Sequence, residues 1–306
     1  MGEIRNDDII TYDTPAYKKR RWQWGDRKEG RRIKTLPAMS YLEPYIMASR
    51  NDSLNHFEDV IDITNIERYL DGKKKDGYTD MTLLHVILAA YVRVISERPG
   101  INRFVAGKRI YARKNIECVM TIKKEMTLES PDTCIKAEFD PRDNIYNVYK
   151  KFKKEVKCAL ESTTGFDDTA KILKRLPRFL MRGLMALLRM LDYFGRLPKS
   201  LLKVSPFHGS MIITSMGSLG IPAIYHHLYN FGTLPVFVSY GNIFTADAVK
   251  RDGSKERHHF VTFRVVTDER ICDGYYYASV FKRLKKILQN PEVLDNTLES
   301  VCEDID

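Results

Sequence analysis

A short run near the carboxyl end of the chain, residues 267–274, brings together aspartate, glutamate, arginine and cysteine side chains. Carboxylates can take a proton from a reacting group, and an arginine can hold a carboxylate through two parallel hydrogen bonds. Glu269 lies within this run. An unperturbed glutamate has a pKa of about 4.3, so it is ionised at neutral pH and is a weak base unless burial raises that pKa. The run is a candidate site for proton transfer.

Two other segments carry side chains of catalytic type. Thr214 and Ser215 end a predicted strand, where a hydroxyl can either donate to a developing oxyanion or satisfy the local backbone. His226 and His227 lie between that strand and the next one. Histidine titrates near neutral pH and is the commonest general base, but a structural pair of histidines explains the sequence as well. Both interpretations stay open for each segment.

The run at 267–274 closely resembles the Asp-His-Arg-x-x-Asp-Gly signature of the dihydrolipoamide (2-oxo acid dehydrogenase) acyltransferase catalytic domain, a relative of chloramphenicol acetyltransferase. Residues 209–221 resemble that family's Gly-Gly-x-Phe-Thr-Ile-Ser-Asn-x-Gly segment, and residues 97–103 resemble the end of its Pro-x-Leu-Asn helix. The three matches keep the family's order within residues 36–296. The resemblance implies a trimeric α/β protein with the two-layer, mixed-sheet sandwich of chloramphenicol acetyltransferase.

The resemblance also implies how acyl transfer is shared between subunits. In the family, a histidine removes the proton from an acceptor hydroxyl or thiol, and a serine hydroxyl of the neighbouring subunit steadies the tetrahedral oxyanion. Glu269 stands at the position of that histidine, and Thr214 and Ser215 straddle the position of the serine. The family's base is therefore replaced in this chain.

The rest of the motif can be kept by structural needs alone. Arg270 and Asp273 correspond to family positions that order the turn through charge pairing, and Gly274 to one that allows close backbone approach. A motif that keeps these residues and exchanges its base fits a protein whose chemistry is altered or lost.

A fainter similarity offers a second base. Residues 226–232 resemble the His-His-x-x-x-Asp-Gly motif of related acyltransferases and condensation domains, with phenylalanine in place of the aspartate. By the family's topology this connection runs near the subunit interface. His227 is therefore an alternative base, with His226 and Asn230 as candidate residues lining the site.

Two functions follow from this resemblance. The first is a coenzyme A-dependent acyltransferase with an altered site, which transfers an acyl group from a coenzyme A thioester to a hydroxyl, amine or thiol of a small-molecule or lipid acceptor. The second is a catalytically inactive trimeric scaffold or binding protein. Upstream of the matched region lies only a short basic arm, so we expect no lipoyl group.

Composition narrows the partners and the location. The chain has 306 residues and a formal net charge of +10, which favours anionic partners such as nucleotide phosphates or lipid headgroups. No recognised nucleic-acid-binding motif is present, so nucleic acid is not expected as a partner.

Five cysteines without paired spacing support neither disulfides nor zinc, and we expect no metal. No apolar run approaches the ~20 residues of a membrane span, so we expect a cytoplasmic protein that is at most peripheral to the membrane.

The elements that must position these residues alternate between strands and helices. We predict a basic arm over residues 1–40 and one catalytic domain over 41–306. Periodicity and turn residues predict strands at 56–63, 109–112, 118–123, 134–139, 209–214, 234–241 and 258–267, and helices at 84–95, 145–160 and 278–288. His258 and His259 begin the last strand, roughly ten residues from Glu269, and are expected to be structural.

Residues 171–203 form a basic, leucine-rich insertion with helical periodicity. Pro177 should kink or restart this helix, and Gly195 with Pro198 should end it. Cationic amphipathic helices often lie at membrane interfaces, so the segment is predicted to touch an anionic membrane surface or a long acyl substrate. The alternative is an ordinary helix that packs its leucines inward.

Overall fold

A computed structural model describes residues 22–123, 127, 130, 132–161, 168, 173–249 and 253–305. Most of the predicted arm, residues 1–21, and the start of the predicted insertion, residues 171–172, lie outside the described residues. The remaining part of the arm is partly structured, since β1 (Gly30–Arg32) pairs with β4 (Arg109–Arg113). The predicted domain boundary at 40–41 falls inside α1 (Ala38–Ile46).

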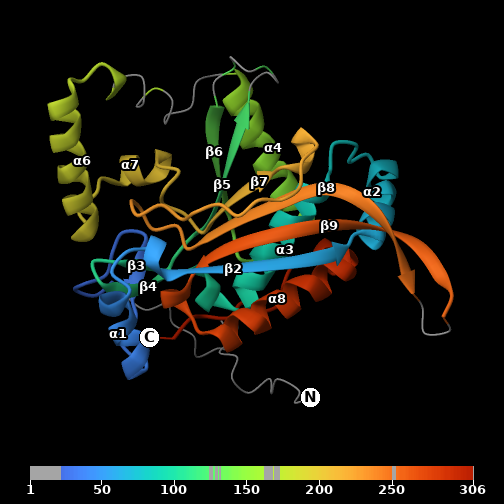
Figure 1. Cartoon of the computed structure of the whole chain (residues 1–306), viewed down its shortest axis with the longest axis horizontal. Helices are drawn as coiled ribbons and strands as arrows, with labels where there is room; N and C mark the ends of the chain where they lie inside the picture. The colour runs from blue at the N-terminus through green and yellow to red at the C-terminus, as the bar shows by residue number, and fades with distance from the viewer. Residues whose placement is uncertain are drawn as a thin grey trace.

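A six-stranded mixed sheet forms the centre of the fold (Figure 1). Its strand order is β2-β9-β8-β7-β5-β6, and β7 runs parallel to both of its neighbours while the other pairs are antiparallel. The strands are β2 (Leu54–Asp62), β5 (Ile116–Lys123), β6 (Asp132–Phe139), β7 (Met211–Ser215), β8 (Val236–Val249) and β9 (Lys255–Asp268). A small sheet of β1, β4 and β3 (Arg103–Ala106) lies beside it. The strands predicted from the sequence are all present, and β8 and β9 extend beyond the prediction into a long hairpin.

Helices cover one face of the large sheet. They are α2 (Thr64–Lys75), α3 (Leu83–Glu97), α4 (Ile145–Glu161) and α8 (Gly274–Gln289). Alternate side chains of a strand point to opposite faces, so Val236 and Val238 of β8 join the core beneath α3 whereas Phe237 belongs to a smaller cluster on the other face. That outer face is covered by chain without regular structure rather than by helices, which makes it the face from which a site can be built.

Of the two predictions for Pro177, the insertion confirms a restarted rather than a kinked helix, which ends before Gly195 as predicted. It contains α6 (Arg178–Tyr193) and α7 (Lys199–Val204), each beginning directly after a proline that fixes its first turn. Gly195, with a positive φ of 67°, turns the chain between them. Within α6, all of whose residues are described, only Asp192 is buried. Leu184, Leu188 and Leu191 are half-buried, whereas Leu180 and Leu187 are about half exposed, so the leucines of this helix pack inward only in part.

The predicted structural role of His258 and His259 is confirmed. His258 pairs with Asp62, and His259 Nδ1 lies 2.5 Å from a carboxylate oxygen of Glu67. The hydrogen bond that the imidazole donates to the Asp62 carboxylate raises the pKa of His258. These pairs fasten the start of β9 to the junction between β2 and α2, at the opposite end of β9 from Glu269.

Gly232 occupies a position that only glycine can fill without strain. Its φ is +90°, and a Cβ there would lie 2.1 Å from the carbonyl oxygen of Phe207, which accepts hydrogen bonds from Thr233 and Leu234. Gly232→Ala is expected to lower the free energy of unfolding by about 2 kcal/mol or more, because the strained backbone and the clash with a fixed carbonyl add.

The matched control is Gly183→Ala in α6, where a Cβ would meet nothing within 4 Å and alanine favours the helix. Urea unfolding followed by circular dichroism measures both variants. Equal transition midpoints for the two would contradict the prediction.

Candidate active site

The turn that carries Glu269 is held by a buried carboxylate. β9 ends at Asp268, a one-turn 3₁₀ helix spans Glu269–Ile271, and α8 begins at Gly274. Asp268 is 1% exposed and receives two nearly parallel hydrogen bonds from Arg270, at 2.8 Å from Nε and 2.7 Å from Nη2. Ser53 Oγ donates a further bond of 3.1 Å. Such bidentate pairing fixes the plane of both groups as well as their distance.

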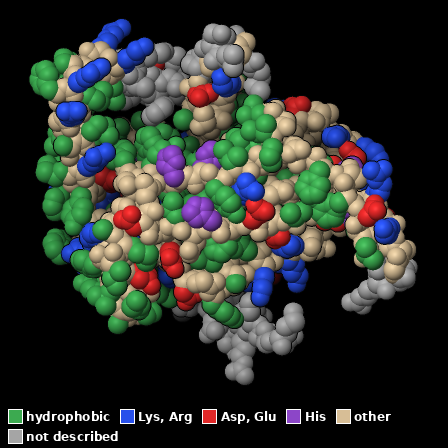
Figure 2. Space-filling model, in the orientation of Figure 1, with side chains coloured by type: hydrophobic (Ala, Val, Ile, Leu, Met, Phe, Trp, Pro, Cys, Tyr) green, Lys and Arg blue, Asp and Glu red, His purple; other side chains and the backbone are tan. Residues whose placement is uncertain are grey.

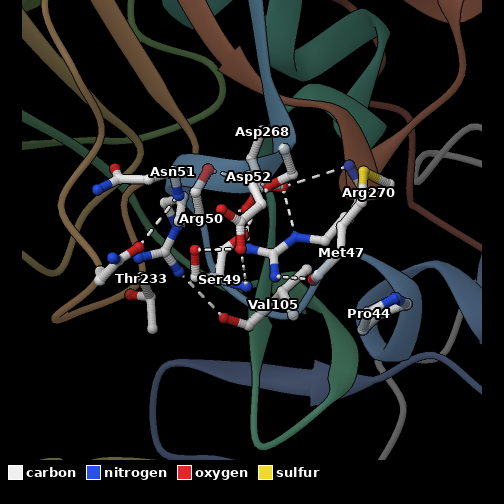
Figure 3. Close-up of polar contacts among 12 residues, drawn as sticks. Pro44, Met47, Ser49, Arg50, Asn51, Asp52, Val105, Thr233, Asp268 and Arg270 are labelled. Carbon is white, nitrogen blue, oxygen red and sulfur yellow. Dashed lines mark hydrogen bonds and ion pairs between the residues drawn. The ribbon is translucent and has the colours of Figure 1, made fainter.

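A second arginine completes this network (Figure 3). Arg50 Nε lies 3.3 Å from Asp268 Oδ2, while its Nη1 and Nη2 donate to the carbonyl oxygens of Tyr229 and Val105. Arg270 Nη1 donates to the carbonyl of Met47. Burial acts to raise the pKa of Asp268, but the hydrogen bonds and charges of Arg270 and then Arg50 outweigh it and hold that pKa below its ordinary value. The network ties β9 to residues brought from three other parts of the chain.

None of these contacts involves Glu269, which is exposed in the single chain. α1 packs against this turn, and the pKa of its Glu43 is raised by burial and then by the nearby charges of Glu269, Asp273 and Asp268. Like charges held close together disfavour ionisation of one member, which is how carboxyl groups in active sites come to hold protons. A rigid turn thus presents Glu269 beside a second carboxyl group.

The predicted roles of the other motif residues are corrected in part. Arg270 does order the turn through charge pairing, but its partner is Asp268 and not Asp273. Asp273 caps α8 instead, with Oδ1 accepting a 2.7 Å hydrogen bond from the backbone N–H of Tyr276. Gly274 is not required for close backbone approach, since a Cβ there would meet nothing within 4 Å. The neighbouring Cys272 is no nucleophile at neutral pH, because burial raises its thiol pKa to about 12.

The structure separates the two candidate oxyanion donors. Ser215 follows the alternation of Met211 and Ile213 toward the helix-covered core, and its Oγ accepts a 3.3 Å hydrogen bond from the backbone N–H of Ser218. Thr214 follows Ile212, whose side chain belongs to the outer-face cluster with Phe237. Of the two residues, only Thr214 therefore points toward the outer face of the sheet.

The segment with the histidine pair crosses this outer face. Arg264 donates to the carbonyl of Ala223 at 2.9 Å, and the ring of His226 stacks on Phe237 with centroids 4.2 Å apart. Further along, Asn230 Oδ1 accepts a 3.1 Å hydrogen bond from the backbone of Asn51, next to Arg50. The segment thus runs from the Thr214 end of the sheet to the buried arginine network. Figure 2 shows histidine side chains gathered on this face among hydrophobic groups.

The two histidines differ in exposure. His226 is half-buried, and burial followed by the charge of His227 lowers its pKa, which suits a neutral stacking partner. His227 is exposed and its ring meets Tyr229 edge-on with centroids 5.1 Å apart. Of the pair, His227 is the one that can reach a ligand, whereas His226 and Asn230 hold the segment on the sheet.

One chain alone does not bring Glu269 and Thr214 together. Thr214 pairs with Ser239 of β8, while Thr267, two residues before Glu269, pairs from the other side of β8 with Val236, three residues before Ser239. Three residues of strand span about 10 Å, and β7 and β9 are two strand spacings apart. A site containing both residues can form only between copies of the chain.

Sequence reasoning missed Asp268, Arg50, Ser53 and Glu43. Asp268 matches the first aspartate of the family signature, so its importance could have been found there. Arg50 and Ser53 lie 218 and 215 residues before Asp268, and no local signal marks them as its partners. Glu43 lies on a mostly exposed helix without a distinguishing pattern.

No three or more His, Cys, Asp or Glu side chains in the described part of the chain are grouped so that they could hold a metal ion. No described helix combines the length and the apolar character needed to cross a membrane.

Neither a family model nor a curated protein matches the sequence, but solved structures share its fold. A probable dihydrolipoamide acetyltransferase from Listeria monocytogenes has a TM-score of 0.53 at 15% identity, over 84% of this chain and 94% of that one. The dihydrolipoamide acetyltransferase of Azotobacter vinelandii has a TM-score of 0.52 at 13% identity, and the match covers 86% of this chain and 93% of that one. The truncated catalytic core of the 2-oxoacid dehydrogenase complex of Thermoplasma acidophilum has a TM-score of 0.50 at 14% identity, and the match covers 85% of this chain and 98% of that one. The chain therefore has the mixed α/β, chloramphenicol acetyltransferase-like fold of the 2-oxoacid dehydrogenase acyltransferase cores, as its sequence motifs predicted.

Proposed function

We propose that this protein is a trimeric acyltransferase in which Glu269 of one copy and Thr214 of the neighbouring copy share a site. The observation that carries this proposal is the exposed Glu269 on a turn fixed by the buried Asp268–Arg270–Arg50 network. A side chain used in catalysis must be held by a rigid support and yet remain free to meet a ligand. The arrangement at Glu269 has both properties.

The proposed chemistry is transfer of an acyl group from a coenzyme A thioester. Glu269 takes the proton of an acceptor hydroxyl, amine or thiol as that group attacks the thioester carbonyl. The hydroxyl of Thr214 donates to the oxyanion that forms, and the thiolate of coenzyme A leaves as the carbonyl is restored. The net charge of +10 favours the approach of the coenzyme A phosphates. This scheme needs neither a lipoyl group nor a metal.

His227 is the second candidate base. It is exposed, and the segment that carries it ends against Arg50, so it faces the same side of the sheet as Thr214. Imidazole is the better base at neutral pH. We place it second because Glu269 stands at the position of the family's base, whereas the resemblance at residues 226–232 lacks the aspartate of its motif.

A screen for thioester turnover tests the proposed activity. The protein is incubated with acetyl-coenzyme A and with longer acyl-coenzyme A thioesters, together with representative hydroxyl, amine and thiol acceptors, and release of free thiol is measured. We expect release above the uncatalysed rate for at least one pair. If no thioester is turned over and none raises the melting temperature, the acyltransferase proposal is wrong.

One observation favours the non-catalytic alternative. The buried contacts of the turn are made by Asp268, Arg270 and Ile271 and not by Glu269, so the turn can persist as a structural element whatever Glu269 does. Under that alternative the trimer forms and no thioester is turned over. Assembly and turnover therefore have to be measured separately.

We predict that the outer face of the sheet is the surface through which copies associate. Exposed apolar side chains gather there, among them Ile221, Ile224, Tyr225 and Val60. A monomer seldom leaves such a group of side chains uncovered. Light scattering of the eluting protein at micromolar concentration should give the mass of a trimer, and Ile221→Asp with Ile224→Asp should give a monomer because each would bury an unpaired carboxylate.

A monomeric wild-type protein under these conditions would rule out both the trimer and the shared site. The control replaces Val249, an exposed apolar residue at the tip of the β8–β9 hairpin, with aspartate and should leave the mass unchanged.

A further inference from the structure

The most unusual surface of the molecule is α6, which stands at one edge of the fold, apart from the sheet and its helices (Figure 1). Side chains that other helices bury are exposed on it: Phe179 is 72% exposed and Phe194, directly after its end, 67%. Leu180, Leu187 and Met190 are each about half exposed. A helix in water does not gain stability by presenting such groups to solvent, so this strip requires a partner.

A basic stripe runs along the same helix. Arg182 and Arg189 follow Arg178 by four and eleven residues, so at 3.6 residues per turn the three guanidinium groups share one side. The exposed apolar side chains occupy the adjacent side, and the half-buried Leu184, Leu188 and Leu191 face the body. Figure 2 shows basic and hydrophobic side chains next to each other along this edge.

The exposed surface of α6 carries no negative charge. Asp192 is its single acidic residue, and it is buried against Arg27, with Nη2 to Oδ1 at 2.7 Å, and near His208 at 3.5 Å. The carboxylate of Asp192 is therefore paired inside the protein, with Arg27 and near His208. The partner must supply negative charge as well as an apolar environment.

The helix is fastened to the body at its C-terminal end. Arg27 Nη1 donates to the carbonyl of Asp192 at 2.7 Å, and Lys28 Nζ donates to that of Leu197 at 2.6 Å. Lys136 Nζ donates to the carbonyl of Leu202 in α7. Contact with a partner would thus orient the whole molecule.

We propose that α6 docks the protein on a phospholipid surface with anionic headgroups. The helix would lie flat, with Phe179, Leu187 and Met190 among the upper parts of the acyl chains and its arginines at the phosphates. A 16-residue helix with three arginines on one side suits the plane of the interface rather than its interior. A second copy fits less well, because it would bring the same arginines and a net charge of +10 to the contact.

Tyrosines near the C-terminal end of α6 also suit the interfacial region of a membrane. Tyr193, at the end of the helix, lies against Gly107, and the adjacent Lys108 donates to the carbonyl of Pro44 in α1, so Tyr193 lies near that helix. Tyr41, Tyr45 and Tyr193 are each about half exposed. Tyrosine is favoured where one end of a side chain is apolar and the other wet, as at a membrane surface.

Vesicle co-sedimentation tests the proposal with the full chain. We expect binding to vesicles of equal parts phosphatidylcholine and phosphatidylglycerol at low salt, weaker binding at high salt, and little binding to phosphatidylcholine alone. Replacing Arg178, Arg182 and Arg189 together with glutamate should weaken partitioning at least on the order of 100-fold. Phe179→Ser with Leu187→Ser should weaken it on both vesicle types without changing the net charge.

The matched control removes the same charge elsewhere. Arg68, Lys74 and Lys75 are exposed on α2, and their joint replacement with glutamate should leave most of the binding intact. Equal losses in the two triple variants would show a nonspecific effect of net charge and overturn the proposal, as would a wild-type protein that ignores anionic vesicles at low salt. A change of mass on light scattering in the α6 variants would instead identify the strip as a contact between copies. Turnover of soluble thioesters should be unchanged in these variants, so this proposal and the proposed function fail separately.

Discussion

Glu269→Gln is expected to reduce thioester turnover by roughly 100- to 10,000-fold and to leave the mass and the melting temperature of the protein unchanged. Glutamine has nearly the shape of glutamate but cannot take up a proton at neutral pH. The fold should not respond, because Glu269 is exposed and the buried contacts of its turn belong to Asp268, Arg270 and Ile271. Glu292→Gln, at an exposed glutamate in the 3₁₀ turn that follows α8, is the control and should keep full activity.

The shared site predicts a further result that a site within one chain does not. Thr214→Ala should also lower turnover, since it removes the proposed oxyanion donor. When the Glu269→Gln and Thr214→Ala proteins are unfolded and refolded together, each mixed trimer contains one interface with both native residues. Random mixing should therefore restore about a quarter of the native activity. No recovery in trimers shown to be mixed would contradict sharing, and unchanged turnover in Glu269→Gln would leave His227 as the candidate base.

Asp268→Asn is expected to be the most destabilising conservative change among the described residues, and to lower the free energy of unfolding by about 3–5 kcal/mol. The amide has the size of the carboxylate but leaves the buried charges of Arg50 and Arg270 without a counter-charge. Arg50 and Arg270 are 5% and 4% exposed, so water cannot take over the role of the carboxylate. Thermal and urea unfolding at neutral pH measure the loss.

The pH dependence gives this prediction a definite sign. The pKa of Asp268 in the folded protein lies below its ordinary value of 3.8, so its contribution to stability is present above that value and is lost as the pH falls through the lower, folded pKa. The gap in stability between wild type and Asp268→Asn should therefore be widest at neutral pH and narrow only in strong acid. Asp273→Asn is the matched control, because asparagine also caps helices and Asp273 is exposed. Equal unfolding midpoints of the two variants would refute the proposed role of the buried network.

Much of the scaffold could be predicted because its signals are local. The apolar spacing from Leu84 to Ile95 and the Pro99-Gly100 stop define α3, and alternation defines most strands of the large sheet. β2 shows the limit of such patterns. Asp59 breaks the alternation of apolar and polar residues in β2, since it lies on the helix-covered face of the sheet. It can do so because β2 is the edge strand, where Lys285 Nζ of α8 donates a 2.9 Å hydrogen bond to Asp59 Oδ1.

The sequence by itself determined the order of strands and helices, and the resemblance of the turn at 267–274 predicted that Glu269 stands in place of the family's histidine. These features depend on neighbours in the chain. Only the tertiary structure decided that Arg50 and Ser53 hold Asp268, that Thr214 and not Ser215 faces the open side of the sheet, and that α6 leaves its apolar strip exposed. Each of these depends on which distant segments meet, and local periodicity does not contain that information, because a side chain's partners are set by the path of the whole chain.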